Sequence, residues 1–202
     1  MKIKIDNYKR KALFEQYDSY TNPFASITTK LDITNIYTLC KESGHFYATM
    51  GYYLSKAMND IDEFKVTYDD GEFYIFDAIT PSYTDIRPDE TIGFYDVPLT
   101  ATYEEYITSY DEAKKKFLAG ESEPPIDGAY VWLSCEPWFK ASAICPPSDK
   151  EKRIPQLIWD RYEIENGRCY VNLMIFFHHG FIDGFHIGKL LNKMEEYIAS
   201  IA

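Results

Sequence analysis

Residues 171–191 read VNLMIFFHHGFIDGFHIGKLL, and this stretch decides how the rest of the chain is interpreted. Residues 171–177 are continuously apolar, which is typical of a buried strand. After Asp183, apolar residues recur at helical spacing and predict an amphipathic helix. Asp183 itself stands where an N-cap or first-turn carboxylate belongs. His178 and His179 therefore lie at the end of a buried strand, just before a helix begins.

The two adjacent histidines are candidates for proton-transfer chemistry, because imidazole exchanges a proton near neutral pH. A lone buried histidine is more often a structural residue of the core. The order His-His-x-x-x-Asp-Gly, with a strand before it and a helix after it, is far more specific than a lone histidine. The stretch therefore predicts a functional site at the mouth of the strand.

Length and composition limit the classes of protein to consider. The chain has 202 residues, which suits one domain with a sizeable core, so we expect residues 1–202 to form a single domain. The formal net charge of −11 argues against nucleic acid or an anionic membrane as a partner. There is no apolar run of about 18 residues, and residues 1–6 do not resemble a signal peptide. Four scattered cysteines favour a reduced, cytoplasmic protein.

The histidines and aromatic residues narrow the kind of site. None of the four histidines shares a ligand spacing with cysteine or aspartate, so we expect no metal. We interpret His45 and His186 as structural or surface residues. Aromatic residues make up 17% of the chain, a high share that fits a core or a pocket lined by rings.

Local patterns predict further secondary structure. The sequence Asp-Asp-Gly at 69–71 indicates a hairpin, and Asn166-Gly167 indicates a turn between the last two strands. Gly44 and Gly120 stand where helices would stop. The expected strands cover residues 26–33, 64–68, 72–76, 129–133, 155–162 and 170–177, with another beginning at 81, and the expected helices cover residues 34–43, 45–60 and 103–118 after a short one within 6–17.

Three segments together resemble one family. HHGFIDGFH at 178–186 is similar to the signature of chloramphenicol acetyltransferases, and a shorter form occurs in the acyltransferase components of 2-oxo-acid dehydrogenase complexes. RKALF at 10–14 resembles the Arg-Lys-x-His-Phe of the chloramphenicol enzymes, although Leu13 replaces the histidine. SCEPW at 134–138 resembles their Ser-x-x-Pro-Trp. The resemblance covers roughly residues 6–198, and without a lipoyl domain or an Ala/Pro linker it fits the stand-alone enzymes.

This resemblance implies a fold, an activity and an assembly. The expected fold class is α/β, specifically an α+β two-layer sandwich in which helices pack on a mixed sheet. The implied activity is transfer of an acetyl group to a hydroxyl of chloramphenicol or a similar small alcohol. Acetyl-CoA is then a co-substrate, with no cofactor bound permanently. The family also implies a homotrimer whose active site lies between subunits.

The resemblance assigns roles to four residues. His179 is the expected general base, and the hydroxyl of Ser134 is expected to stabilise the oxyanion of the tetrahedral intermediate. Asp183 and Arg10 are expected to form a structural ion pair that holds the turn after His179. The family has a threonine where Ile158 stands here, so the water-mediated role of that threonine is expected to be absent.

The acceptor side departs most from the family. Chloramphenicol acetyltransferases carry a longer, aromatic insertion where residues 121–128 (ESEPPIDG) form a short loop. Tyr17, Tyr20, Phe24 and Tyr83 are the expected acceptor-binding residues, with packing in the core as the alternative. We therefore expect weaker binding of chloramphenicol than in enzymes with the full loop.

Three alternatives stay open from the sequence. The acceptor could be a different hydroxylated compound, given the shortened loop. The chain could instead be a non-catalytic, ligand-binding homologue, although intact candidate catalytic residues argue against this. A purely structural oligomer would not need a pair of histidines at a pocket.

Overall fold

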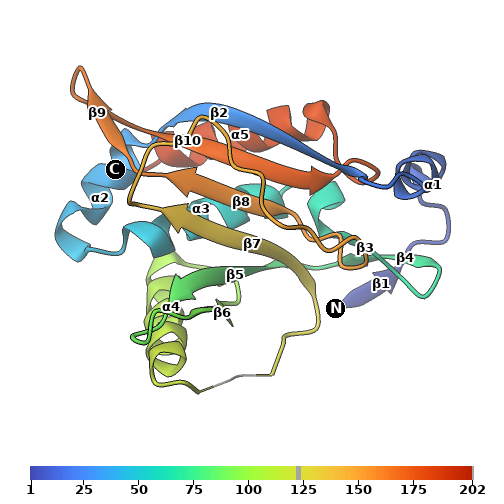
Figure 1. The fold of residues 1–202 in the computed structure, drawn as a ribbon, viewed down its shortest axis with the longest axis horizontal. Coiled ribbons are helices and arrows are strands. Elements are labelled where there is room, and N and C mark those ends of the chain that lie inside the picture. Colours follow the sequence, from blue (N-terminus) through green and yellow to red (C-terminus); the bar gives the residue numbers. More distant parts are fainter. Residues whose placement is uncertain (122–123, 202) are drawn as a thin grey trace.

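The computed structural model describes residues 1–121 and 124–201, and a mixed sheet forms its centre (Figure 1). The strands of this sheet are β2 (Phe24–Asp32), β5 (Ile79–Ile86), β6 (Ile92–Asp96), β7 (Ala129–Glu136), β8 (Gln156–Asp160), β9 (Glu163–Glu165) and β10 (Arg168–His178). Within the described residues they lie in the order β2-β10-β8-β7-β5-β6, and β9 pairs with β10 beside this path. The pairs β5–β7 and β7–β8 are parallel, and the remaining pairs are antiparallel.

Four helices cover one face of this sheet, so the described part of the chain forms two layers (Figure 1). The helices are α2 (Thr34–Ser43), α3 (Phe46–Asn59), α4 (Tyr103–Leu118) and α5 (Gly184–Ala199), while α1 (Lys11–Asp18) lies at the end of the sheet (Figure 1). The predicted mixed α/β fold with helices packed on a mixed sheet is confirmed. The predicted helical segments agree with α2, α3 and α4 to within one residue at each end.

A smaller sheet lies beside the main one. Its strands are β1 (Lys2–Lys4), β3 (Val66–Asp69) and β4 (Glu72–Phe76), in the order β1-β4-β3, and the short 3₁₀ helix η1 (Asp62–Lys65) precedes it. The hairpin predicted at Asp69-Asp70-Gly71 is confirmed. Both Asp70 (φ 48°) and Gly71 (φ 82°) adopt the left-handed conformation that a two-residue hairpin turn requires.

The alternation along β7 decides which side chains face the helices. Val131 and Leu133 are fully buried toward the helical layer, and Trp132 and Ser134 point to the opposite, open face because side chains alternate along a strand. The segment between β7 and β8 crosses that open face (Figure 1). This face of the sheet is therefore covered by chain without helices, which leaves room for pockets.

The junction between β10 and α5 has the predicted form. Asp183 is the N-cap of α5, and its Oδ1 accepts a hydrogen bond from the backbone N–H of Phe185 at 3.0 Å. The turn between strand and helix packs closely on α1. A Cβ atom at Gly180 would lie 2.8 Å from the Cα of Phe14, so this position needs glycine. The strand-turn-helix arrangement predicted for residues 171–191 is confirmed.

Several details differ from the sequence-based prediction. Ser134 lies inside β7, which continues to Glu136, whereas the strand was expected to end at residue 133. The Asn166-Gly167 turn joins β9 to β10, and not β8 to β10. Strands β1, β6 and β9 were not predicted, because they have three to five residues each and lie at sheet edges. Of the shortened loop, residues 122 and 123 lie outside the described residues.

Candidate active site

His179 follows the last residue of β10, and its surroundings fix both its orientation and its tautomer. Its Nδ1 lies 3.0 Å from the carbonyl oxygen of Ile182. Because a carbonyl oxygen can only accept, Nδ1 must carry the proton, and Nε2 of the neutral ring keeps its lone pair. The ring of Tyr17 stacks on the imidazole with centroids 4.3 Å apart. His179 is therefore held with Nε2 ready to accept a proton.

Arg10 and Asp183 meet beneath this turn. The Nη1 of Arg10 lies 3.0 Å from Oδ2 of Asp183, and Nε donates to the carbonyl of Gly180 at 3.5 Å. Partial burial pushes the pKa of the Asp183 carboxyl upward, but the hydrogen bond from Arg10 and the nearby His186 outweigh this and lower the pKa. The pair thus connects the start of α1 to the N-cap of α5, on either side of the His179 turn.

His186 has a larger part in this arrangement than its sequence context indicated. It is buried in the first turn of α5, with Nδ1 2.9 Å from Oδ1 of Asp183. Its Nε2 lies 3.4 Å from the buried carboxylate of Glu63, which also pairs with Lys9 at 3.0 Å. The position three residues after an N-cap is where a capping-box partner stands, and this was the available signal in the sequence.

His178 is enclosed, unlike its neighbour. Its Nδ1 accepts from the N–H of Gly180 at 3.2 Å, and its Nε2 lies 3.2 Å from Oδ1 of Asp18. Asp18 is in turn paired with Arg153 at 2.9 Å. Burial lowers the pKa of His178 to about 4, against the opposing effect of Asp18. A buried imidazole that stays neutral at pH 7 and accepts a hydrogen bond from the Gly180 backbone is a structural group.

The lowered pKa of His178 predicts a loss of stability in mild acid. Between pH 6.5, where an unfolded histidine titrates, and about pH 4, the unfolded chain binds a proton that the folded chain rejects. The free energy of unfolding should therefore fall as pH decreases, by about 2 kcal/mol between pH 6.5 and pH 5. His178→Asn should show this dependence reduced by that amount when urea unfolding is compared at pH 7 and pH 5. Equal pH dependence of both proteins would contradict the prediction.

Three of the four expected acceptor-binding residues gather around the histidine pair. Tyr17 contacts His179 as described, and the ring of Tyr20 lies edge-on to Tyr17 at 5.4 Å. Phe24 stacks on Phe176 with centroids 4.9 Å apart. These rings form an aromatic border beside the candidate base.

Tyr83 does not belong to this border, and its expected acceptor-binding position is wrong. It has 0% exposed surface and lies in the core, where its hydroxyl is 2.7 Å from that of Tyr106 and donates to the carbonyl of Ala48 at 3.3 Å. A Cβ atom at Gly51 would overlap the Tyr83 hydroxyl, so the close approach of α3 depends on that glycine. The ring faces the helical layer, because odd-numbered residues of β5 and β7 point there together.

Ser134 lies on the open face of the sheet and lines two pockets. The first, of ≈ 370 Å³, reaches Trp138, and we call it the Trp138 pocket. The second, of ≈ 360 Å³, reaches Cys145, and we call it the Cys145 pocket. The Ser134 hydroxyl donates to Oε1 of Glu136 at 3.5 Å, and Glu136 lines both pockets too. Ile158, opposite Ser134 on β8, supplies an apolar wall of the Cys145 pocket.

His179 and Ser134 are far apart within one chain. Ser134 pairs with Ile158, and Ile158 with Met174, so Ser134 lies level with a residue five positions before His179. Two strand spacings amount to about 10 Å and five residues of strand to about 17 Å. The two candidate catalytic residues are therefore separated by about 20 Å, so a single chain does not bring them together.

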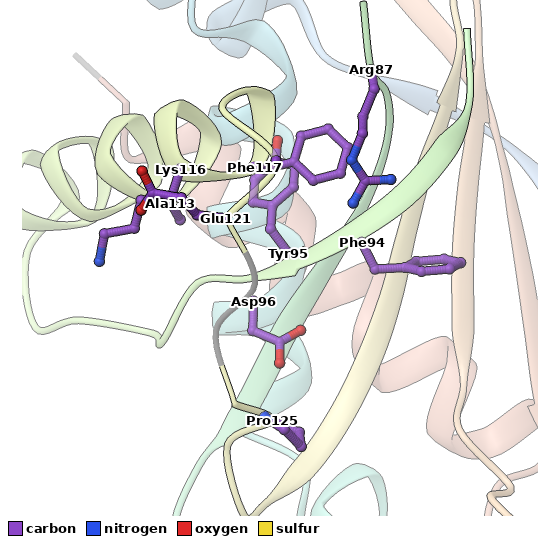
Figure 2. A pocket seen from close by; sticks show the side chains of 10 residues that line it. Arg87, Phe94, Tyr95, Asp96, Ala113, Lys116, Phe117, Glu121 and Pro125 are labelled. Atoms are coloured by element: carbon purple, nitrogen blue, oxygen red, sulfur yellow. The ribbon is translucent and has the colours of Figure 1, made fainter. Parts of the chain in front are cut away.

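A third pocket lies at the β6 edge of the sheet, between α4 and β6 (Figure 2). Its volume is ≈ 230 Å³, and none of the candidate catalytic residues lines it. The guanidinium of Arg87 lies 4.4 Å from the ring centroid of Phe117. Figure 2 shows these two side chains next to each other. Arg87 also donates to the carbonyl of Ile92 at 3.5 Å, so its guanidinium already contacts two groups of the same chain.

Neither a cluster of metal ligands nor a membrane-spanning helix occurs within residues 1–121 and 124–201. In that part of the chain, no group of three or more histidine, cysteine, aspartate or glutamate side chains is placed to hold a metal ion. Nor does any helix there have the length and apolar character needed to cross a bilayer.

Comparison with solved structures gives the class of protein. A solved chloramphenicol acetyltransferase superposes with a TM-score of 0.82 at 26% identity, covering 98% of this chain and 100% of the other. A probable dihydrolipoamide acetyltransferase from Listeria monocytogenes shares the fold, with a TM-score of 0.71 at 16% identity over 98% of this chain and 94% of the other. The similarity to the chloramphenicol acetyltransferase, at 26% identity, makes this fold that of an acyltransferase.

Comparison of sequences identifies the family. A sequence model of chloramphenicol acetyltransferase matches residues 1–195. Chloramphenicol acetyltransferases of Vibrio anguillarum (30% identical, 98% of this chain, 94% of theirs) and Campylobacter coli (28% identical, 98% and 97%) are similar over nearly their whole length. The chain belongs to the chloramphenicol acetyltransferase family. The predicted family and enzyme class are therefore confirmed, and the family is acetyl-CoA-dependent.

Proposed function

We propose that residues 1–202 form one chloramphenicol acetyltransferase-like domain that transfers acetyl from acetyl-CoA to a hydroxyl of chloramphenicol or a similar small alcohol. The observation that carries this is the state of His179. The carbonyl of Ile182 accepts from its Nδ1–H at 3.0 Å, so the lone pair of Nε2 is free for the substrate hydroxyl. The family membership supports acetyl-CoA as the acyl donor.

In the proposed reaction, Nε2 of His179 removes the hydroxyl proton as the acceptor oxygen attacks the thioester carbonyl. The carbonyl oxygen becomes the oxyanion of a tetrahedral intermediate, and the Ser134 hydroxyl turns from Glu136 to donate its hydrogen bond to it. The intermediate then collapses, the carbon–sulfur bond breaks, and the proton on His179 passes to the sulfur of CoA. The acetyl ester and free CoA are the products, and His179 returns to its neutral state without forming an acyl-enzyme.

A site that uses both residues must be shared between copies of the chain. The separation of about 20 Å within one chain is too large for a single acyl group to contact both. Around Ser134, the open face also exposes Ile92 (65%), Phe94 (61%) and Trp138 (61%). Such an exposed apolar surface is typical of an interface. We therefore propose a homotrimer in which His179 of one copy faces Ser134 of the next.

A complementation experiment tests the shared site. His179→Ala and Ser134→Ala should each be nearly inactive, because loss of an oxyanion donor alone costs roughly 10²–10³-fold in rate. Co-expressed with different tags and purified through both, they should form mixed trimers. Each mixed trimer then contains one intact site of three, so activity should return to about one third of wild type.

The complementation experiment needs one control, and two outcomes would contradict the shared site or the trimer. Two copies of His179→Ala with different tags, purified in the same way, should stay inactive. If the mixed assemblies also stayed inactive, the residues would not share a site across the interface. A monomeric mass in light scattering, with full activity at micromolar concentration, would equally contradict the trimer.

The identity of the acceptor needs a direct assay. Release of the CoA thiol should be followed with chloramphenicol and with a panel of other alcohols. Because the loop at residues 121–128 is shorter than in the family, we expect a higher Michaelis constant for chloramphenicol than in enzymes with the full loop. No thiol release with any alcohol would favour a non-catalytic, ligand-binding homologue.

A further inference from the structure

Glu136 places a carboxylate inside the candidate acyl-transfer site. It lies two residues after Ser134 on β7, so both side chains point to the open face of the sheet. The Ser134 hydroxyl donates to its Oε1 at 3.5 Å, and both residues line the Trp138 and Cys145 pockets. A group bound close to Ser134 must therefore also lie close to a carboxylate.

This carboxylate has no positive partner in the described part of the chain. No lysine, arginine or histidine nitrogen there lies within 4.0 Å of it. The neighbouring acids are compensated: Asp85 pairs with Lys114 at 3.0 Å, and Asp160 with Lys140 at 3.2 Å. Burial raises the pKa of Glu136, and the hydrogen bond from Ser134 opposes this only in part. A partly buried acid without a counter-ion stabilises any cation that can reach it.

The walls around Glu136 also suit a cation with an apolar body. Among the described residues that line the Cys145 pocket, Glu136 is the one with a charged side chain. Trp132 and Phe94 contribute ring surface there, and Trp138 does so in the neighbouring pocket. Aromatic faces attract ammonium groups, as Lys152 already illustrates at 5.9 Å from the Trp132 ring.

We propose that the acceptor is an amino alcohol, whose ammonium group binds Glu136 while its hydroxyl receives the acetyl group beside Ser134. This proposal rests on the proposed acetyl transfer and names its substrate class. Glu136 is then a specificity-determining residue. It favours a cationic alcohol over a neutral one of the same shape and disfavours an anionic one. The negative net charge of −11 adds to this preference, because it attracts cationic ligands over longer distances.

A matched pair of alcohols tests the proposal. 4-(Aminomethyl)benzyl alcohol and 4-ethylbenzyl alcohol have nearly the same shape and differ by one positive charge. Thiol release from acetyl-CoA should give the cationic alcohol a kcat/KM about tenfold higher in the wild type. Glu136→Gln, which keeps the shape and removes the charge, should make the two values about equal. Glu112→Gln changes the same charge on the exposed side of α4 and should leave the wild-type ratio intact.

Binding measured without turnover separates this proposal from the transferase proposal. Both alcohols are titrated calorimetrically against His179→Ala and against His179→Ala/Glu136→Gln. Stronger binding of the cationic alcohol that is lost with Glu136→Gln supports the cation subsite, even if no alcohol is acetylated by the wild type. Turnover without any preference between the two alcohols, or a preference that Glu136→Gln leaves unchanged, overturns the subsite alone. Absence of both binding and turnover for every alcohol overturns both proposals.

Discussion

Replacing His179 with alanine is expected to lower turnover by at least ~10³-fold and to leave the affinity for acetyl-CoA unchanged. The physical reason is that the alanine has no group to take the hydroxyl proton in the transition state. Among the described residues, the ring bonds to Ile182 through its Nδ1, stacks on Tyr17 and lies edge-on to Phe177 with centroids 6.1 Å apart. Steady-state thiol release gives kcat, and calorimetric titration gives the dissociation constant for acetyl-CoA.

Variants of two other histidines test whether the loss of turnover is specific to His179. His45 lies near the surface, 3.1 Å from Asp111, and His45→Ala should keep wild-type turnover. His178→Asn removes the enclosed neighbour and should reduce stability more than kcat when measured at pH 7.5. If His178→Asn abolished turnover in a folded protein while His179→Ala stayed active, the base would be assigned to the wrong ring.

Removing the charge of Asp183 is expected to cost about 3 kcal/mol of stability. Breaking one partner of a buried pair typically costs about 3–5 kcal/mol, and we expect the lower end because the Asp183 side chain is 30% exposed and that of Arg10 14%. Asp183→Asn leaves the guanidinium without its anion, and its Nη2 already has no hydrogen-bond partner among the described residues. Urea unfolding monitored by fluorescence measures the loss.

Asparagine is the informative substitution because it can still cap a helix. The hydrogen bond from the Phe185 N–H to the side chain is therefore kept, and the lost free energy reports on the charge of Asp183, which faces Arg10 and His186. In the double variant with Arg10→Met, the loss should be smaller than the sum of the two single losses, since no charge is left unpaired. Asp183→Asn with wild-type stability would show that the pair does not stabilise the turn.

The sequence was sufficient to predict the segments with strong local signals. The strand before His178 has a long apolar run, α5 has both a cap and a helical period, and the Asp-Asp-Gly hairpin has turn residues that leave few other conformations. Family resemblance then predicted that Arg10 and Asp183 would approach each other from opposite ends of the chain. Local patterns alone cannot predict such a contact, because they contain no information about long-range distance.

Other features depended on which way a side chain points. From the sequence, Tyr83 could have lined a pocket or packed in the core. Its pairing with Leu133 on β7 shows that its side chain faces the helices. Glu136 stands at one of the x positions of the Ser-x-x-Pro-Trp pattern, which the pattern does not specify. Apart from its charge, nothing in the sequence therefore predicted that it would lie beside Ser134. Strand β9 has three residues, too few for a period to be detected.

The position of His179 directly after β10 affects which local unfolding events can displace it. This strand pairs with β2 along most of its length on one side and with β8 and β9 on the other. Amide hydrogens in such a doubly paired, buried strand exchange with solvent only when the whole molecule unfolds. The proposed base directly follows this strand, so we expect partial opening of sheet edges or surface segments to leave it in place.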